Sequence, residues 1–165
     1  MNPPFNKKFI LELFETIKKN SYPELSKCNL YFKQMSITAY SSPFTNCIYI
    51  NLELINQEKL TTTELVAILA HELSHQISYQ KRNFISKWLF LSGYFIFTNS
   101  REKVENEADI ITIERGYEKE LIFEREHQMK RYKKRFKNNP KMINLVSKIY
   151  YSSDEIKNIM EKISR

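Results

Sequence analysis

The chain has little glycine, little proline and few turn-forming residues of any kind. Only two glycines and five prolines occur in 165 residues, which excludes collagen-like, low-complexity and linker-rich proteins. The length fits a single domain, residues 1–165, with a hydrophobic core of its own. Long stretches rich in lysine and glutamate indicate that the domain is mainly helical.

Cysteine is scarce as well. The two cysteines, Cys28 and Cys47, do not form a C-x-x-C pair. This spacing gives little support to a redox or zinc-binding role for them. It favours two reduced, buried, small apolar side chains in a cytoplasmic protein.

Long apolar runs are also missing. The longest uncharged apolar stretch, "WLFLSGYFIFTNS", has 13 residues between Lys87 and Arg101, whereas a membrane-spanning helix needs roughly 20. The first residues, "MNPPFNKKFILELFE", carry charges within every apolar run and do not resemble a secretory signal. We therefore expect a cytoplasmic protein, in which residues 84–97 form either a buried helix or a peripheral contact with a membrane or partner.

Positive charge is concentrated in one segment. The net charge is +7, and the stretch from His127 to Ser153 contains eight lysines and arginines but no acid. Subtracting these eight leaves the rest of the chain near −1. A solvated helix face explains such a segment, and so does weak contact of residues 130–141 with an anionic membrane or nucleic acid. No nucleic-acid-binding motif is visible.

The hydrophobic pattern predicts an α+β fold. Helical spacing recurs in the first twenty residues, where Pro3 or Pro4 fits the first turn. Three short runs rich in Ile, Tyr, Phe and Thr then predict a small three-stranded antiparallel sheet. These runs are "CNLYFKQ" (28–34), "SITAYS" (36–41) and "CIYINLEL" (47–54).

Further helices fill the remainder of the chain. Thr61 followed by Glu64 predicts a capping box at the start of a helix over residues 61–80. Ser100 is expected to cap another helix, which Gly116 ends. We expect additional helices over 84–97 and 117–136, and one or two after "NNP" (138–140), with "SSDE" (152–155) as a helix start.

The stretch "AILAHELSHQISY", residues 67–79, contains His71, Glu72 and His75. Positions four apart share a helix face, so both imidazoles can reach one metal ion at about 2.0–2.1 Å each. Glu72 lies about 100° further around the helix, where its carboxylate can take a proton from a metal-bound water. The surrounding residues are apolar, so these polar side chains are expected to be partly buried and to need partners.

Partners are supplied by "REKVENEADIITIERG", residues 101–116. A catalytic zinc site uses three protein ligands, and two histidines with one glutamate are an established set. Glu105 is the expected third ligand, and Asp109, one turn later, can hydrogen-bond the free ring nitrogen of a ligand histidine. Glu102, which shares the face of Glu105, and Glu107, about 200° around the helix, are the rivals for the third position.

Together, "HELSH", "ENEAD" and the preceding strand "CIYINLELI" resemble the gluzincin metallopeptidases. The closest resemblance is to the minigluzincins, small soluble relatives of the membrane-bound CaaX prenyl protease and heat-shock membrane peptidase group. It covers roughly residues 37–125. It implies a mainly helical zincin-like domain whose small sheet packs on the active-site helix. The catalytic core would span about 1–125, followed by a basic helical extension over about 126–165.

The resemblance also implies roles for individual residues. Glu72 would be the general base and acid, His71, His75 and Glu105 the Zn²⁺ ligands, and Asp109 their hydrogen-bonding support. A peptide or protein substrate would pair with an edge strand, for which the expected residues are Cys47, Ile48, Tyr49 and Ile50.

Several points stay open at the level of sequence. The residue that stabilises the oxyanion is one of His127, Arg125, Arg131 and Tyr117. The segment after Pro140 could fold across the cleft and make the enzyme latent. The alternatives to a peptidase are a catalytically silent zinc-binding module and a basic partner-binding module. A regulator-cleaving metallopeptidase of mobile elements is a further alternative, although such enzymes often carry Asn in place of Asp109.

Overall fold

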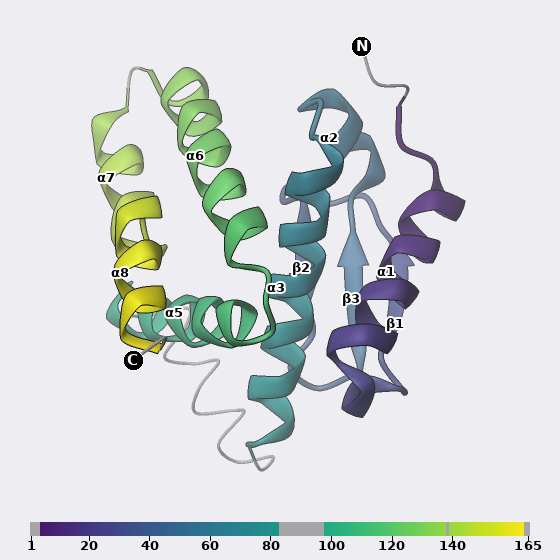
Figure 1. Ribbon diagram of the computed structural model, residues 1–165. Helices are drawn as coiled ribbons and strands as arrows, with labels where there is room; N and C mark the ends of the chain where they lie inside the picture. The colour runs from purple at the N-terminus through teal and green to yellow at the C-terminus, as the bar shows by residue number, and fades with distance from the viewer. Residues whose placement is uncertain (1–3, 83–97, 138, 164–165) are drawn as a thin grey trace.

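One long helix, α3 (Thr62–Gln80), runs through the middle of the molecule (Figure 1). A computed structural model describes residues 4–82, 98–137 and 139–163. Around α3 lie α1 (Lys7–Ser21), η1 (Pro23–Leu25), β1 (Asn29–Phe32), β2 (Ala39–Ser41), β3 (Cys47–Ile50), α2 (Leu52–Gln57), α5 (Thr98–Glu114), α6 (Glu118–Arg135), α7 (Pro140–Ile149) and α8 (Ser153–Ile163). α1 and the sheet occupy one side of α3, and α6, α7 and α8 the other. The expected α+β class is confirmed.

The sheet is mixed, so the expectation of a purely antiparallel sheet is wrong. Its strand order is β1-β3-β2, in which β2 and β3 are antiparallel but β1 and β3 are parallel. A short turn joins β2 to β3 and makes them a hairpin. β1 lies on the other side of β3 from β2 and runs parallel to β3. Alternation of apolar residues is the same in either arrangement, so it does not reveal strand order.

β3 is the central strand, and the expected edge-strand position of Cys47, Ile48, Tyr49 and Ile50 is therefore also wrong. Both sides of β3 are occupied, by Asn29–Phe32 and by Ala39–Ser41. The strand is also shorter than expected. The Asn51 side chain accepts a hydrogen bond from the backbone N–H of Leu54 and begins α2, so the run after Ile50 is helical.

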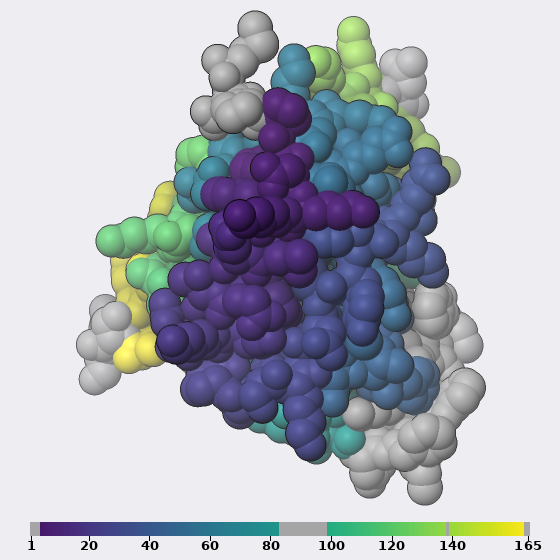
Figure 2. Space-filling model, turned by 90° about the vertical axis from the view of Figure 1, so that its right-hand side faces the viewer, coloured from purple at the N-terminus to yellow at the C-terminus, as the bar shows by residue number. Residues whose placement is uncertain are grey.

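The main core lies between α1, the sheet and α3. α1 begins at Lys7, with Asn6 as its N-cap, so Pro4 precedes the helix rather than lying in its first turn. α1 covers the flank of the molecule that Figure 2 shows, and its apolar residues Ile10, Phe14 and Ile17 are buried beneath it. The residues at the centre of this core are fully or almost fully buried and include Ile10, Phe14, Leu30, Ile48, Ile50, Leu65, Leu69 and Leu73. The sheet thus packs on α3 as expected.

The start of α3 and the end of α5 are well defined. The capping box of α3 is confirmed: Thr61 accepts from the backbone N–H of Glu64, and the Glu64 side chain accepts from that of Thr61. Ser100 is not the N-cap expected for α5, because it lies inside the helix, which already includes Thr98. Gly116 has a φ of 86°, a conformation that side chains rarely adopt, and it ends the helix where predicted.

The C-terminal helices pack on α5 and α6 (Figure 1). Ile156 of α8 is fully buried in a second small core with Ile113 and Leu121. The expected break at "NNP" is present, since Asn139 caps α7 and Pro140 opens it. Ser152 and Glu155 begin α8 by bonding each other's backbone N–H. The boundary expected at residues 125 and 126 falls inside α6.

Within the described ranges, no helix combines the length and the apolar character needed to cross a membrane. The helix expected over residues 84–97 lies outside these ranges.

Candidate metal centre

Two histidines of α3 form one half of the site. His71 and His75 are one turn apart, and their rings meet edge to face with centroids 4.6 Å apart. They are only 7% and 5% exposed. Their burial follows from the apolar positions of α3, which fix this face of the helix toward α5 and the sheet. Two buried imidazoles one helical turn apart can supply two ligands to one metal ion.

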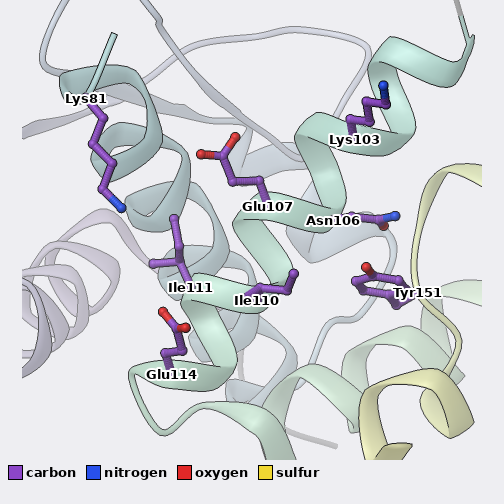
Figure 3. A pocket seen from close by; sticks show the side chains of 8 residues that line it. All are labelled: Lys81, Lys103, Asn106, Glu107, Ile110, Ile111, Glu114 and Tyr151. Carbon is purple, nitrogen blue, oxygen red and sulfur yellow. The ribbon is translucent and has the colours of Figure 1, made fainter. Parts of the chain in front are cut away.

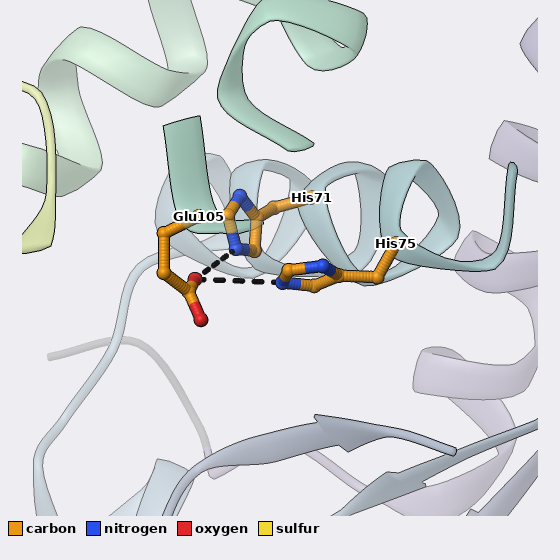
Figure 4. Close-up of side chains that lie close together, drawn as sticks. All are labelled: His71, His75 and Glu105. Atoms are coloured by element: carbon orange, nitrogen blue, oxygen red, sulfur yellow. Dashed lines mark hydrogen bonds and ion pairs between the residues drawn. The ribbon is translucent and has the colours of Figure 1, made fainter. Parts of the chain in front are cut away.

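Glu105 of α5 completes the cluster (Figure 4). Its Oε2 lies 3.1 Å from Nε2 of His71 and 3.4 Å from Nε2 of His75. Two ligands bound at about 2.0–2.1 Å to one tetrahedral ion are about 3.3–3.4 Å apart, so the separation of Glu105 from each histidine fits a pair of ligands on one cation. In the described part of the chain, this trio is the one group of His, Cys, Asp and Glu side chains able to hold a metal ion.

Asp109 contacts His71 at the ring nitrogen that faces away from Glu105. It is fully buried, and its Oδ1 lies 2.8 Å from Nδ1 of His71. Burial would raise the pKa of Asp109, but the Arg125 guanidinium and His71 together outweigh burial and keep the pKa below its ordinary value. A charged carboxylate at Nδ1 turns the other nitrogen of His71 toward Glu105, the arrangement in which a histidine binds metal.

The ionisation of the cluster reflects this close packing. Burial alone would lower the pKa of His71, but the Asp109 carboxylate near Nδ1 and the hydrogen bond with Glu105 together outweigh burial and raise the pKa to about 10. Burial likewise opposes ionisation of Glu105, yet His75 and His71 hold its pKa well below the ordinary value. Glu105 is therefore charged at neutral pH, as a carboxylate ligand must be.

Glu72 lies beside this cluster with part of its hydrogen-bonding capacity unused. The side chain is 9% exposed, and its Oε2 has no hydrogen-bond partner among the described residues. Burial raises the pKa of Glu72, which the neighbouring His75 and His71 partly offset. A buried carboxylate with a raised pKa and a free oxygen is suited to accepting and returning a proton.

The rivals of Glu105 lie elsewhere on α5. Glu107 lines a separate hollow of about 450 Å³ (Figure 3) and pairs with Arg82, with 2.6 Å between Nη2 and Oε2. Glu102 is half-buried and does not belong to the group that could hold a metal. None of the residues that line this hollow belongs to that group, so the hollow is not the candidate metal centre.

The candidates for the oxyanion-stabilising residue are engaged in other contacts. Arg125 donates to Asp109, and Arg131 forms ion pairs with Glu124 and other acids. The Tyr117 hydroxyl lies 2.9 Å from that of Ser21. His127 Nδ1 lies 2.9 Å from a backbone carbonyl one turn earlier in its own helix. Which residue stabilises the oxyanion stays a prediction.

Two residues near the site were missed in the sequence. Gln76 donates from Nε2 to Ser41 Oγ at 2.7 Å and to the Ser42 carbonyl at 2.9 Å, and so ties α3 to the end of β2. Tyr40 of β2 lies within electrostatic reach of Glu72, since burial and then the Glu72 carboxylate raise the pKa of its hydroxyl. No motif marks either residue, because both roles depend on the position of β2 beside α3.

Comparisons with protein-family models, with curated proteins and with solved structures find no match to this chain.

Proposed function

We propose that this chain is a zinc-dependent endopeptidase of the gluzincin type. The observation that carries the proposal is the position of Glu105 Oε2, within 3.4 Å of Nε2 of both His71 and His75. Glu72, whose buried Oε2 has no hydrogen-bond partner in the part of the chain that the structure describes, stands next to this trio. Two histidines, one glutamate and an adjacent carboxylate are the donor set that zinc peptidases use.

The proposed chemistry divides between the ion and the protein. A bound zinc ion supplies Lewis acidity toward the substrate carbonyl and toward water. Glu72 accepts a proton from the attacking water and returns it to the leaving amine, so that one peptide bond is broken by one water molecule. Asp109 holds His71, and the buried walls of α3 and α5 limit the access of other water molecules to Glu72.

The edge strand β2 suggests how a peptide is held. Ser42 N–H bonds the Cys47 carbonyl and Asn51 N–H bonds the Thr38 carbonyl, at the two ends of the β2–β3 pair. Hydrogen-bonded and non-hydrogen-bonded pairs alternate in an antiparallel ladder. The backbone N–H and C=O groups of Tyr40 therefore point toward β3, whereas those of Ala39 and Ser41 point away from it. An extended substrate added at this edge would lie next to α3. We further propose a cytoplasmic enzyme, consistent with the free thiols of Cys28 and Cys47.

The proposal is tested with Glu72→Gln. This variant keeps all three metal ligands, so it should bind zinc with wild-type stoichiometry while cleavage of a casein-type substrate is lost. Wild-type cleavage should disappear with a chelator and return with zinc. Full cleavage by Glu72→Gln would overturn the proposal. Zinc binding by the wild type without any chelator-sensitive cleavage would instead indicate a catalytically silent metal-binding module.

A further inference from the structure

A series of ion pairs with alternating charges leads away from the candidate metal centre, and all of its members except Arg131 are buried. Asp109 Oδ1 accepts from Arg125 at 2.6 Å, and Arg125 also donates to Glu124 at 2.7 Å. Glu124 lies 3.5 Å from Arg131, which in turn pairs with Glu64, the N3 residue of the α3 capping box. These ion pairs therefore connect α5, α6 and the first turn of α3.

Arg125 is the member of this series of ion pairs that contacts Asp109. The Asp109 oxygen that it holds, Oδ1, is the same atom that faces Nδ1 of His71 at 2.8 Å. Arg125 is itself 7% exposed, and its guanidinium lies over the Tyr150 ring at 4.5 Å from the centroid. A side chain enclosed in this way has little freedom, so it fixes the position of the oxygen that it contacts.

The charges give a second reason for this arrangement. Asp109 and Glu105 are both buried carboxylates, and both contact His71. Two like charges this close oppose each other's ionisation unless a cation offsets them. Arg125 supplies that cation, and burial of its own charge is offset by Glu124. Loss of Arg125 would leave Asp109 buried without its strongest partner.

We propose that Arg125 is a positioning residue of the metal centre: acting through Asp109, it fixes His71 with Nε2 directed at the ion. The proposal rests on the metal site of the proposed function but not on peptide cleavage. Arg125 touches neither the ion nor the substrate. Its contribution is expected in metal affinity, and it should vanish when Asp109 can no longer carry it.

Zinc affinity measured by competition with a chelator dye tests this relationship. Arg125→Met should weaken binding by about tenfold or more, within the range of about 10–100-fold found when support behind a metal ligand is lost. Arg125→Lys should recover part of the loss, because it restores the charge but not the two-pronged geometry. Asp109→Asn should weaken binding similarly, and adding Arg125→Met to Asp109→Asn should cost little more, as expected for residues acting in series.

The matched control is Arg115→Met. Arg115 also joins two helices, through the Ser21 carbonyl and Glu24, and both of these partners lie outside the candidate metal centre. It should lower the melting temperature of the metal-free protein without changing zinc affinity. If Arg125→Met does not fold, Arg125→Lys and Glu124→Gln carry the test, and at least one of them should weaken zinc binding.

The outcomes separate the two proposals. Wild-type zinc affinity in folded Arg125→Met, or losses that simply add in the double variant, would overturn the role of Arg125 and leave the peptidase proposal standing. Normal zinc binding by the wild type without cleavage would overturn the peptidase proposal and leave the role of Arg125 standing. A wild-type protein that binds no zinc would overturn both.

Discussion

Asp109 Oδ1 and His71 Nδ1 lie 2.8 Å apart, in the interior between α5 and α3. This contact joins the two sequence segments that carry the candidate metal ligands, 34 residues apart as measured from His71 to Glu105. The candidate metal centre therefore depends on helix packing as well as on motif spacing. Its affinity for zinc should therefore respond to changes at Asp109 as well as at the three candidate ligands.

Replacing Asp109 with Asn should weaken zinc binding by about 10–100-fold, because an amide holds the His71 ring less firmly than a carboxylate does. Isothermal titration or chelator competition measures the change. Asp154→Asn is the control, since Asp154 is exposed and, within the described ranges, forms an ion pair with Lys157 alone. Unchanged affinity in Asp109→Asn would argue against a supporting role for Asp109.

Replacing Glu105 with Ala should abolish stoichiometric zinc, because it removes the one ligand that α5 contributes. Glu107→Ala provides the comparison on the same helix, as Glu107 pairs with Arg82 outside the trio. We expect Glu107→Ala to retain one zinc ion per chain by elemental analysis. Equal zinc loss in the two variants would show that α5 does not present Glu105 as the structure has it.

Replacing Thr61 with Ala should reduce the free energy of unfolding by about 1 kcal/mol, the usual cost of losing a side-chain N-cap. Thr61 is the N-cap of α3, whereas its neighbour Thr63 is exposed and makes no recorded cap bond. Urea denaturation of Thr61→Ala and Thr63→Ala compares the two. Similar losses in both would show that the capping box contributes nothing particular to α3.

The stability of the protein should fall in alkaline solution through Tyr22. This side chain is fully buried, its hydroxyl donates to the Ala70 carbonyl, and burial raises its pKa above the ordinary value. Above a pH of about 10 the unfolded chain releases the phenolic proton while the folded protein keeps it, so the free energy of unfolding decreases as pH rises.

Tyr22→Phe tests this contribution, because phenylalanine does not titrate. Denaturation curves between about pH 8 and 11 should show a smaller alkaline loss for Tyr22→Phe than for the wild type. Cys28, whose pKa burial raises to about 12, contributes equally to both proteins and cancels in the comparison. Identical pH profiles would mean that the Tyr22 hydroxyl is not held as the structure shows.

Local signals in the sequence predicted most of the helical elements. The capping box at Thr61, the stop at Gly116 and the start at Ser152 each depend on neighbouring residues, and each is present. The prediction that Ser100 caps a helix was wrong, because a serine can also lie inside a helix with its side chain turned outward. For Leu52 and the residues after it, the strand prediction was wrong because Asn51 caps a helix there.

Features that depend on tertiary arrangement were less predictable. Tyr49 has the same alternating neighbours in a central strand as in an edge strand, so sequence could not show that β3 is central. The proximity of Glu105 to His71 followed from known ligand sets, but the contact of Arg125 with Asp109 did not. It depends on how α6 packs against α5, which no local pattern encodes.

Diffraction from crystals grown with zinc, measured at the zinc absorption edge, tests the central claim most directly. We predict one strong anomalous peak per chain, bonded to Nε2 of His71, Nε2 of His75 and a carboxylate oxygen of Glu105. A peak at a different set of residues, or no peak at these three with zinc in excess, would contradict the account.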